Sequence, residues 1–427
     1  MLPVRPSTPK VRPAVPILGT PCNTRLLPLA LATFAVGTDG FVIAGLLPAI
    51  ADDLDVSVPT AGQLVTVFAL TLAVAAPVLG WATSALDRRT ALLLALGVFV
   101  IGNAATAMAS SYGAVMGARV VTAAGAGIIT STTASAAVAV TPPERRGRAL
   151  AFVLGGLTLS SAIGLPLGTL IGRGDWHLTL WAVAALGAVA ALGIAFGIPR
   201  ITLPAATFRA RLAPLKDRWV LGVLTVTMLA LTGTYLLYTY IAAALDDVTG
   251  GSEATLTAVL FVYGLGVLGG NLLAGRLSDR HRPERVLLGS LAAAIIVLAV
   301  GRAAVETLPT AFVWTAALGL CAGVPVVPQQ HRLVAHAPSA TPVLLGLNAS
   351  AIYVGVALGG ALGGLAQQAV SPMWLGVPAA VVTAVALLLA MASARRSGGQ
   401  DPAAEPDLAG AQDARANYSH GSGTSPR

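Results

Sequence analysis

Twelve long apolar stretches follow one another along the chain, separated by short segments rich in charged residues, proline and glycine. A bilayer core about 30 Å thick needs roughly 20 apolar residues per helix, because backbone polar groups cannot stay unpaired in lipid. Each stretch meets this need. The pattern predicts membrane-spanning helices over residues 26–49, 58–80, 90–109, 113–138, 149–172, 178–198, 219–243, 255–275, 286–304, 310–328, 343–368 and 374–393.

The longest internal connection, residues 199–218, divides the spans six and six. We therefore predict an N-terminal half over 26–198, a cytoplasmic central loop over 199–218 and a C-terminal half over 219–393. Residues 1–25 are rich in proline and arginine and do not resemble a cleavable signal peptide, so we predict a cytoplasmic N-terminal segment and a retained first span. Residues 394–427 have the composition of a disordered cytoplasmic tail.

Composition supports a membrane protein and excludes other classes. Of the 427 residues, 56% are hydrophobic and 10% are charged, and the mean hydropathy is +0.79. A soluble domain carries about 25% charged residues, and a disordered chain has low hydrophobicity. The two cysteines and five histidines show neither a disulfide framework nor metal-ligand spacing, so we expect no metal and no cofactor.

The distribution of Lys and Arg predicts the orientation. With the N-terminus inside, 23 of the 26 basic residues fall in inner segments, whereas the outer loops hold only Arg173 and Arg302 together with eight acidic residues. Short cytoplasmic loops carry an excess of basic residues in membrane proteins. We predict a multi-pass protein of a bacterial plasma membrane with both termini cytoplasmic. The net charge of +8 thus reflects topology, and a nucleic-acid partner is not expected.

Two landmarks recur in both halves at nearly the same spacing. Gly80 and Gly275 each end the second span of a half and precede basic residues, and glycines recur every four residues in the fifth and eleventh spans. These two runs are Gly164, Gly168 and Gly172, and Gly355, Gly359 and Gly363. Either run alone is explained by close helix packing. Their matching places favour an all-α membrane protein of two pseudo-symmetric six-helix halves, a transporter architecture with substrate bound between the halves.

Asp39 and Arg119 are the two charged residues, among Lys, Arg, Asp and Glu, that fall well inside predicted spans. Each costs at least about 2.5–3.5 kcal/mol at a helix centre, so such groups usually face a cavity or a partner. Asp39 lies about 16 Å and Arg119 about 9 Å from the outer ends of their spans, a difference that a long arginine side chain can narrow. Burial favours a protonated carboxyl and a nearby arginine favours an ionised one. We interpret Asp39 as a proton carrier partnered by Arg119; the alternative is a static structural ion pair.

Three motifs resemble those of the major facilitator superfamily. Residues 119–127, RVVTAAGAG, resemble its fourth-helix motif, in which an arginine precedes Gly125 and Gly127. Residues 275–280, GRLSDR, look like its signature loop, G-x-L-x-D-R. Residues 157–172, LTLSSAIGLPLGTLIG, are similar to the fifth-helix motif of drug/proton antiporters. The resemblance covers roughly residues 26–393. It implies the twelve-helix antiporter branch that includes bacterial chloramphenicol-type drug exporters and arabinose-type sugar exporters.

The resemblance also implies residue roles. The signature loop braces the cytoplasmic ends of the two halves in the outward-open state, the fourth-helix arginine takes part in proton coupling, and the fifth-helix residues shape a seal against leak. Carried over, the loop residues are Gly80, Arg88 and Arg89 in the first half and Gly275, Asp279 and Arg280 in the second, and the seal residues are Gly164, Pro166 and Gly168. The alternatives are positive-inside anchoring for the arginines and a helix kink at the proline.

The sequence departs from the family pattern in two places. In the first-half loop, Ser84 and Ala85 replace the aspartate and the following arginine, so either the brace is weaker there or Asp87 serves instead. Relatives often carry an acid directly before the phenylalanine, where this chain has Gly40. A shift of one position along a helix rotates the side-chain direction by about 100°, so Asp39 points in a different direction from the acid of those relatives.

The predicted function is proton-coupled efflux of a small amphiphilic drug or antibiotic by alternating access, with chloramphenicol-like compounds first to try. The alternative is proton-coupled export of a sugar or other metabolite. A drug site is mostly apolar and aromatic with a few polar groups. The candidates are Phe34, Phe41, Phe68, Asn103, Tyr235, Tyr238, Tyr263, Asn348 and Tyr353. We expect a monomer in the lipid bilayer, powered by the proton gradient. The chain has no phosphate-binding loop, nucleophile triad or long soluble loop, so an enzyme, a sensor and an ATP-driven pump are not expected.

Overall fold

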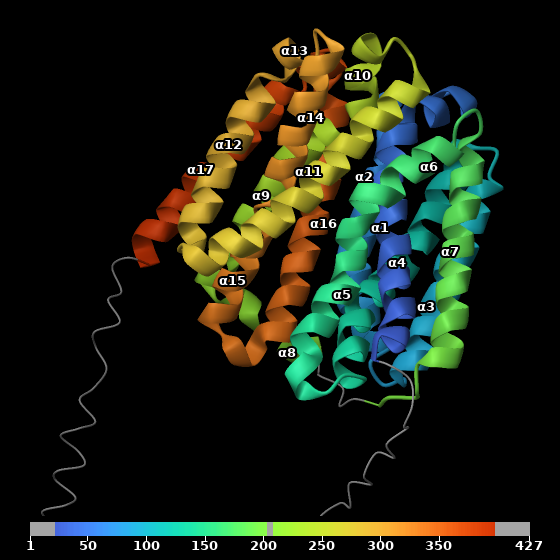
Figure 1. The fold of residues 1–427 in the computed structure, drawn as a ribbon, viewed down its shortest axis with the longest axis vertical. Coiled ribbons are helices and arrows are strands. Elements are labelled where there is room, and N and C mark those ends of the chain that lie inside the picture. The colour runs from blue at the N-terminus through green and yellow to red at the C-terminus, as the bar shows by residue number, and fades with distance from the viewer. Residues whose placement is uncertain (1–21, 203–207, 398–427) are drawn as a thin grey trace, which may run out of the picture.

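A computed structural model describes residues 22–202 and 208–397, and this part of the chain is a bundle of long helices (Figure 1). Eleven helical segments among these residues are long and apolar enough to cross a membrane. The remaining span is α12 (Pro283–Ala299), which has 17 residues and is followed by the short α13 (Gly301–Ala304). The prediction of an all-α fold with twelve spans is therefore confirmed.

The first half contains six spans. They are α1 (Cys22–Asp53), α2 (Val58–Ala82), α3 (Arg88–Ala107), α4 (Tyr112–Ala139), the composite of α5 (Arg146–Leu159) with α6 (Leu165–Ile171), and α7 (Trp176–Gly197). The second half repeats this number. Its spans are α9 (Arg218–Tyr238) with α10 (Ile241–Thr249), α11 (Glu253–Arg280), α12 with α13, α14 (Leu308–Gly323) with α15 (Val326–His336), α16 (Thr341–Ala366) and α17 (Gly376–Ser397).

The helix bounds differ from the predicted ones mainly at the ends. The first and last helices run past residues 26 and 393, because polar and basic residues, among them Arg25, Arg395 and Arg396, continue the helical turns beyond the apolar stretch. The predicted central loop contains the short helix α8 (Phe208–Leu212) and a 3₁₀ turn over Ala213–Lys216. Most of the predicted N-terminal segment, residues 203–207 of the loop and the tail from residue 398 onward lie outside the described residues.

The fifth span is interrupted by a π-helical turn over Ser160–Gly164. Pro166 stands two residues beyond it. Proline has no N–H to donate and its ring clashes with the carbonyl four residues earlier, here that of Ala162, so the preceding turn widens. The local change of pitch re-aims the residues on either side of the turn.

The two glycine runs occupy equivalent places in the two halves. A Cβ added at Gly164 would overlap the side chain of Thr38 in α1, and one added at Gly168 would overlap Val42. In the second half, Gly355 and Gly359 lie against the backbone and Tyr235 of α9 in the same way. The fifth span thus packs on the first span as the eleventh packs on the seventh, which is the pseudo-symmetry that the spacing predicted.

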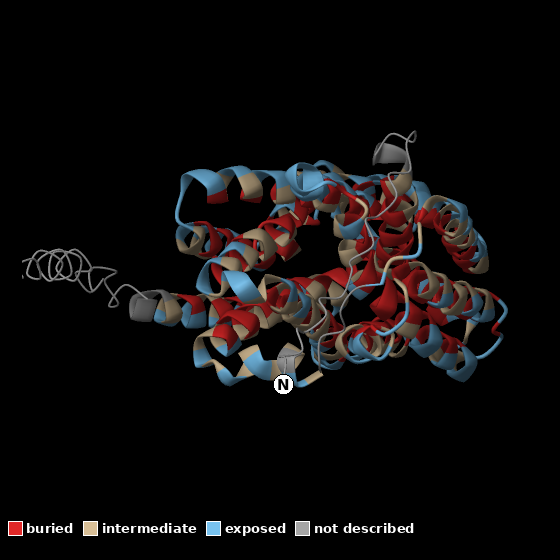
Figure 2. Ribbon diagram, turned by 90° about the horizontal axis from the view of Figure 1, so that it is seen from below, coloured by how far each residue is buried: buried red, intermediate tan, exposed pale blue. Residues whose placement is uncertain are grey.

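Apolar side chains cover the outside of the bundle as well as its interior. Figure 2 shows buried residues gathered where helices meet and exposed residues around the periphery. The exposed set includes large apolar side chains such as Phe196, 89% exposed, and Val313, 72% exposed. Exposed apolar surface of this extent around a helical bundle suits a lipid environment.

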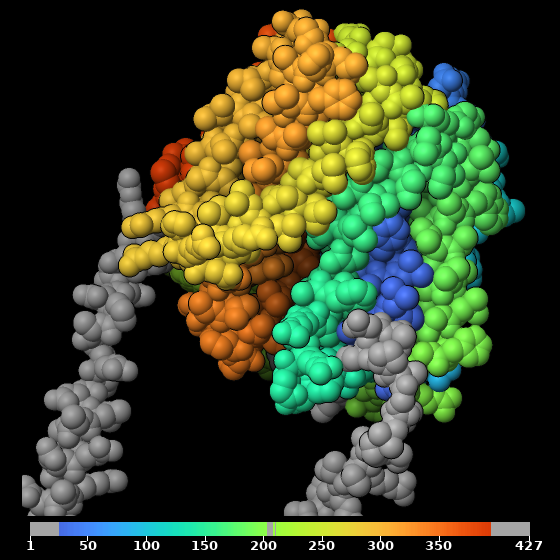
Figure 3. Space-filling view, viewed as in Figure 1, coloured from blue at the N-terminus to red at the C-terminus, as the bar shows by residue number. Residues whose placement is uncertain are grey.

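The two halves meet at one end of the bundle, which we call the outer end because it carries the predicted outer loops. Gly62 of α2 faces the ring of Tyr240, and Gly264 of α11 lies against the carbonyl of Ser161. The Thr169 and Thr257 hydroxyls are 3.3 Å apart across the same boundary. At the opposite, inner end, α5 diverges from α15 and α16, and Figure 3 shows the molecule hollowed between them. The structure is closed at the outer end and open at the inner end.

Candidate functional site

Asp39 of α1 and Arg119 of α4 form a buried ion pair. Arg119 Nη1 donates to Asp39 Oδ1 over 2.6 Å, and the two side chains are 1% and 0% exposed. The Arg119 guanidinium lies 4.1 Å from the centre of the Phe68 ring, an additional cation–π contact. The two membrane charges singled out by the sequence are therefore in direct contact.

The ion pair is incompletely satisfied. Asp39 Oδ2 and Arg119 Nε are buried and have no hydrogen-bond partner among the described residues. A buried polar atom without a partner loses the free energy of its contacts with water, about 1–3 kcal/mol. Each end of the pair thus retains one group that can accept or donate a further bond.

The fifth span holds α1 in place beside Asp39. The π-helical turn brings Ser160 against Gly37, where a Cβ would overlap the serine hydroxyl, and it brings Gly164 against Thr38. Pro166 follows these contacts in sequence and is buried. One turn of α6 further on, the Gly168 carbonyl accepts a hydrogen bond from Thr179 Oγ1 of α7 over 2.7 Å. The antiporter-motif residues therefore fix the stretch of α1 that carries Asp39. Whether they also form a seal against leak stays a prediction.

A small cavity lies between the two halves beside the ion pair, with about 100 Å³ of space for a water-sized molecule. This volume is below the roughly 300–1,000 Å³ of typical small-molecule sites, so the cavity must widen to hold a drug-sized ligand. Its wall combines α1, α2, α4 and α5 of the first half with α9 and α16 of the second. The lining residues are Val36, Gly37, Gly40, Phe41, Val65, Phe68, Ala69, Arg119, Leu157, Tyr235, Ile352, Tyr353 and Val356.

Four of the predicted cavity residues line this space: Phe41, Phe68, Tyr235 and Tyr353. The other five, Phe34, Asn103, Tyr238, Tyr263 and Asn348, are not in its wall. The two tyrosines among them are buried and stack on each other at 4.7 Å. Asn103 donates to the Phe99 carbonyl and Asn348 accepts from Thr227, so both amides serve packing within a half.

The other lining residues are small or aliphatic. On α1 they lie on either side of Asp39, with Val36 and Gly37 before it and Gly40 after it. On α16 they lie on either side of Tyr353, namely Ile352 and Val356. Such residues have no chemical signature of their own. Their place in the cavity wall could have been predicted only from their spacing to the predicted aromatic residues, because helix positions three and four apart lie on the same face.

The predicted signature-loop residues lie at the inner end and are not brought together. Asp279 and Arg280 end α11 as exposed side chains and form no ion pair within the described part of the chain. Gly275 has open space around its Cα, whereas Gly80 packs against Ser131 of α4. The two copies of the motif therefore differ in packing as well as in sequence.

In the first-half loop, Asp87 is the N-cap of α3. Its carboxylate accepts hydrogen bonds from the N–H and the hydroxyl of Thr90, and the hydroxyl bond lowers the pKa of this carboxyl. Arg88 is mostly buried next to it, and its backbone N–H donates to the Ile201 carbonyl over 2.8 Å. Arg89 is half-buried. Asp87 thus caps a helix within its own half in this structure.

The predicted spans 310–328 and 343–368 place Arg332 in the inner loop between them, and the structure corrects this prediction. The residue lies in α15 with its side chain 2% exposed. The tenth span breaks between Gly323 and Val326 and continues as a second helix, so residues beyond the apolar stretch remain inside the bundle. The polar run from Gln329 to Arg332 gave the appearance of a loop.

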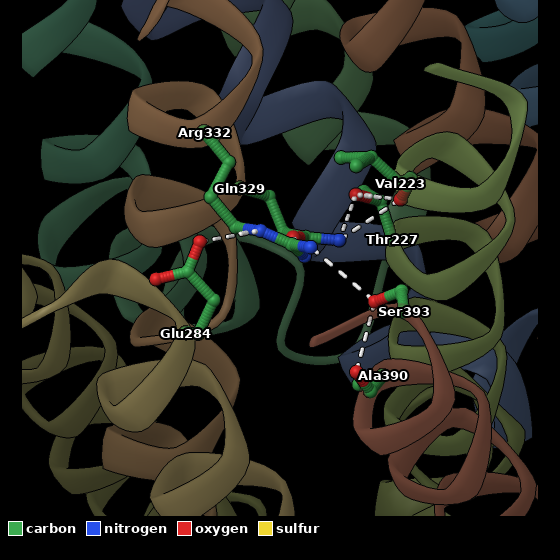
Figure 4. Close-up of polar contacts among 7 residues, drawn as sticks. All are labelled: Val223, Thr227, Glu284, Gln329, Arg332, Ala390 and Ser393. Atoms are coloured by element: carbon green, nitrogen blue, oxygen red, sulfur yellow. Dashed lines mark hydrogen bonds and ion pairs between the residues drawn. The ribbon is translucent and has the colours of Figure 1, made fainter. Parts of the chain in front are cut away.

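A polar network around Arg332 joins α15 to α9, α12 and α17 (Figure 4). Arg332 Nη1 donates to Gln329 Oε1 over 2.7 Å, and its Nε lies 3.4 Å from a carboxylate oxygen of Glu284 in α12. Arg332 Nη2 reaches Ser393 of α17 at 3.3 Å, and Gln329 Nε2 donates to the Val223 carbonyl of α9 at 2.9 Å. The network ties the inner end of the second half into one unit.

A hydrogen bond between His336 and Asp217 closes the same end of this half. His336 Nε2 and Asp217 Oδ2 are 2.7 Å apart, and the His336 ring stacks on Trp219 at 4.2 Å. Asp217 is also the N-cap of α9, accepting from the Trp219 N–H over 2.8 Å. The bond to His336 is the main reason why the pKa of Asp217 is lowered.

The chain matches the family model described as "Major Facilitator Superfamily" over residues 29–242 and 223–420. It is 33% identical over 380 residues to "Inner membrane transport protein YdhP" of Escherichia coli (strain K12), an alignment covering 88% of this chain and 97% of that protein. It is 37% identical over 266 residues to the "Chloramphenicol resistance protein" of Streptomyces lividans, covering 61% of this chain and 67% of that one.

Among solved structures, the fold resembles a bacterial homologue of the human lysosomal transporter Spinster, described as inward-facing and unoccupied. The TM-score is 0.71 at 16% sequence identity, with 88% of this chain and 98% of that chain covered. An identity this low supports the fold alone.

Proposed function

The chain belongs to the major facilitator superfamily of membrane transporters, and we propose that it exports a small amphiphilic drug or antibiotic in exchange for protons. The resemblance noted from its motifs is thereby confirmed. The protein is a transporter rather than an enzyme, and a multi-pass protein of a bacterial plasma membrane. The observation that carries the proposal is the buried Asp39–Arg119 ion pair, whose arginine lines the cavity between the halves.

The proton step falls to Asp39. Its carboxyl is fully buried, which favours the neutral form, and it touches a guanidinium, which favours the ionised form. These effects oppose each other at one group, so a small change in the distance to Arg119 alters proton affinity. Proton uptake from the outer side and release to the inner side would then follow the conformational cycle, with no cofactor and the proton gradient as energy source.

The open end supports export. If both termini are cytoplasmic, as the positive-inside distribution predicts, the hollow between α5 and α16 opens to the cytoplasm and receives substrate from there. Closure of the inner end would bring the α11–α12 loop against the first half. The exposed Asp279 and Arg280 are free to form the brace in that outward-open state.

The cavity wall favours a drug over a sugar. Its side chains are aliphatic and aromatic apart from Arg119 and the two tyrosine hydroxyls. A sugar site needs a hydrogen-bond partner for nearly every hydroxyl, because an unpaired polar group in a buried site is costly. The Streptomyces lividans relative that is named a chloramphenicol resistance protein supports the same choice and suggests phenicols as first substrates.

Everted membrane vesicles test the exchange. Vesicles containing the protein should accumulate radiolabelled chloramphenicol when their lumen is acidified, and nigericin in potassium buffer should abolish the accumulation by collapsing the pH gradient. Vesicles from cells lacking the protein are the control. Accumulation that continued after collapse of the gradient would contradict proton exchange.

A further inference from the structure

The cavity wall carries one charged side chain among its lining residues, and that charge is positive. Arg119 lines the space, whereas Asp39 lies behind it and is fully buried. When Asp39 is ionised, the pair is neutral overall. When Asp39 is protonated, Arg119 is an unpaired cation. The wall is therefore neutral or positive throughout a proton cycle and never negative.

A cationic substrate gains no net attraction in either state, because the pair is neutral when Asp39 is ionised and Arg119 repels the cation when Asp39 is protonated. Such a substrate would also lose its hydration on entering an apolar wall that offers no unpaired counter-charge. Buried charges are tolerated where a counter-charge is present. The one nearby carboxylate is already bonded to Arg119 at 2.6 Å.

An anionic substrate fits the wall but couples to protons with the wrong sign. An anion beside Arg119 would compete with the Asp39 carboxylate for the guanidinium and would therefore favour protonated Asp39. Because coupling between two ligands is reciprocal, a proton on Asp39 would then strengthen binding of the anion. Proton and anion would travel together, which opposes the exchange proposed above.

An uncharged substrate satisfies both requirements. Its aromatic body can pack against Phe41, Phe68 and Tyr353. Asp39 Oδ2 and Arg119 Nε lack partners but are buried, so a substrate reaches them only when the wall at Gly37 and Gly40 opens. A donor on the substrate would then bond Asp39 Oδ2, and an acceptor would bond Arg119 Nε. Gly37 and Gly40 line the wall on either side of Asp39 and add no side chain to shield its carboxyl.

The donor gives the coupling its correct sign. A substrate N–H or O–H bonds a carboxylate more strongly than a protonated carboxyl, since charge-assisted hydrogen bonds are the stronger kind. Substrate binding thus favours ionised Asp39, and a proton on Asp39 weakens substrate binding. Proton and substrate exclude each other, as exchange requires.

We propose that the cavity selects uncharged aromatic amphiphiles bearing a hydrogen-bond donor and an acceptor, and that Arg119 is the residue that excludes cations. This selection rests on the proposed exchange with protons. It makes Arg119 a specificity-determining residue as well as the partner of Asp39.

Three compounds with one nitrophenyl scaffold test the charge rule: chloramphenicol, its deacylated amine, which is cationic at neutral pH, and its anionic succinate ester. Tetraphenylphosphonium serves as a permanent cation. In everted vesicles with an acid lumen, we expect uptake of chloramphenicol to exceed that of both cations by about tenfold or more, with no exchange-driven uptake of the ester.

The outcomes separate the two proposals. Proton-driven uptake of either cation at a rate like that of chloramphenicol would overturn the charge rule and leave proton exchange standing. Exchange-driven uptake of the succinate ester would also overturn the charge rule and leave proton exchange standing. Absence of gradient-driven uptake for all four compounds would overturn the proposed drug export and, with it, the charge rule.

Variants of Arg119 test its part directly. Arg119→Lys keeps the positive charge and should still exclude tetraphenylphosphonium, whereas Arg119→Gln leaves Asp39 free to attract it and should raise its binding to purified protein by about tenfold or more. Arg302→Gln, which removes an exposed arginine, should match wild type. Equal exclusion of the cation by folded Arg119→Gln protein would contradict the assignment. If that variant does not fold, uptake of the compounds by wild type still decides the charge rule.

Discussion

The hydroxyl of Tyr238 donates a hydrogen bond to the backbone carbonyl of Phe41, 3.2 Å away, and so joins α9 of the second half to α1 of the first. Phe41 is two residues from Asp39 on the same helix. The edge of the Phe41 ring also meets the Tyr238 ring, with centroids 6.2 Å apart. The closed outer end is thereby connected to the helix that carries the proposed proton carrier.

Tyr238→Phe should weaken outer closure. The loss of one buried hydrogen bond, about 0.5–1.5 kcal/mol, corresponds to a roughly two- to tenfold shift toward the outward-open form. The shift can be measured as faster maleimide labelling of a cysteine placed at Thr66, which faces Gly360 across the boundary between the halves. The labelled protein carries serine at Cys22 and Cys321.

Tyr112→Phe is the control for this variant. It makes the same chemical change within the first half, where the Tyr112 hydroxyl donates to the Thr60 carbonyl, and should not alter labelling. Equal labelling of the two variants would contradict a role for Tyr238 in closure.

Asp39→Asn should abolish proton-driven exchange and leave a folded protein. Asparagine keeps the shape of the side chain but cannot carry a proton, and Arg119 beside it has the environment that it already meets when Asp39 is protonated. Gradient-driven uptake in everted vesicles, together with monodisperse elution in detergent, checks both parts. Asp55→Asn in an outer loop is the matched control, since the exposed Asp55 has φ 49° and asparagine accepts this conformation. Exchange that remained driven by pH in Asp39→Asn would remove Asp39 from the mechanism.

Gly164→Ala should disturb the site through packing alone. The added methyl overlaps Thr38, next to Asp39, and overpacking of this kind destabilises by about 1–3 kcal/mol. We expect a lower melting temperature in detergent and slower exchange. Gly155→Ala in the same span has no atom within 4 Å of its added Cβ and should be neutral or slightly stabilising. Thr38→Ala in combination with Gly164→Ala removes the hydroxyl and methyl overlaps and should restore part of the stability, and no recovery would show that the contact with Thr38 is not the cause.

Arg332→Met should destabilise the second half more than Glu284→Gln does. The first change leaves Gln329 Oε1 without its donor and the Glu284 carboxylate without its counter-ion, at a cost of about 1–3 kcal/mol. Glu284 is about one-third exposed and can be rehydrated, whereas Arg332 keeps its bonds to Gln329 and Ser393 in the second variant. Thermal unfolding compares the two, with Arg302→Met as the exposed control. An equal or opposite order would argue against the network as the source of stability.

The Asp217–His336 pair should give a contribution to stability that depends on acid pH. The pKa of Asp217 is lower in the folded protein, so its contribution is present above the unfolded value of about 3.9 and is lost as pH falls through the lowered folded value. Asp217→Asn retains an N-cap but not the ionised partner. Melting temperatures of wild type and variant should differ at pH 7 and converge below about pH 4. A difference that stayed constant down to pH 3 would exclude titration of Asp217 as its cause.

The fold could be predicted closely because lipid imposes a length and a polarity on every span. The Asp39–Arg119 contact could be anticipated because charges inside spans are rare enough to stand out. The cavity wall could not, because the side of a helix that faces the cavity depends on its rotation and pitch, and the π turn at Ser160–Gly164 alters both. The rotation of each helix thus decides that Tyr235 and Tyr353 line the cavity while Tyr238 and Tyr263, with the same side chain, lie outside it.

The burial of Arg332 bears on how the protein is made. A helix such as α15, carrying Gln329, His331 and Arg332, is a poor candidate for independent transfer from the translocon into lipid, because arginine alone costs about 2.5–3.5 kcal/mol at a helix centre. Its partners in α9 and α12 are synthesised earlier. They are thus already available when α15 emerges from the ribosome. The order of synthesis along the chain thus provides the partners in α9 and α12 before α15, whereas the contact with Ser393 of α17 forms later.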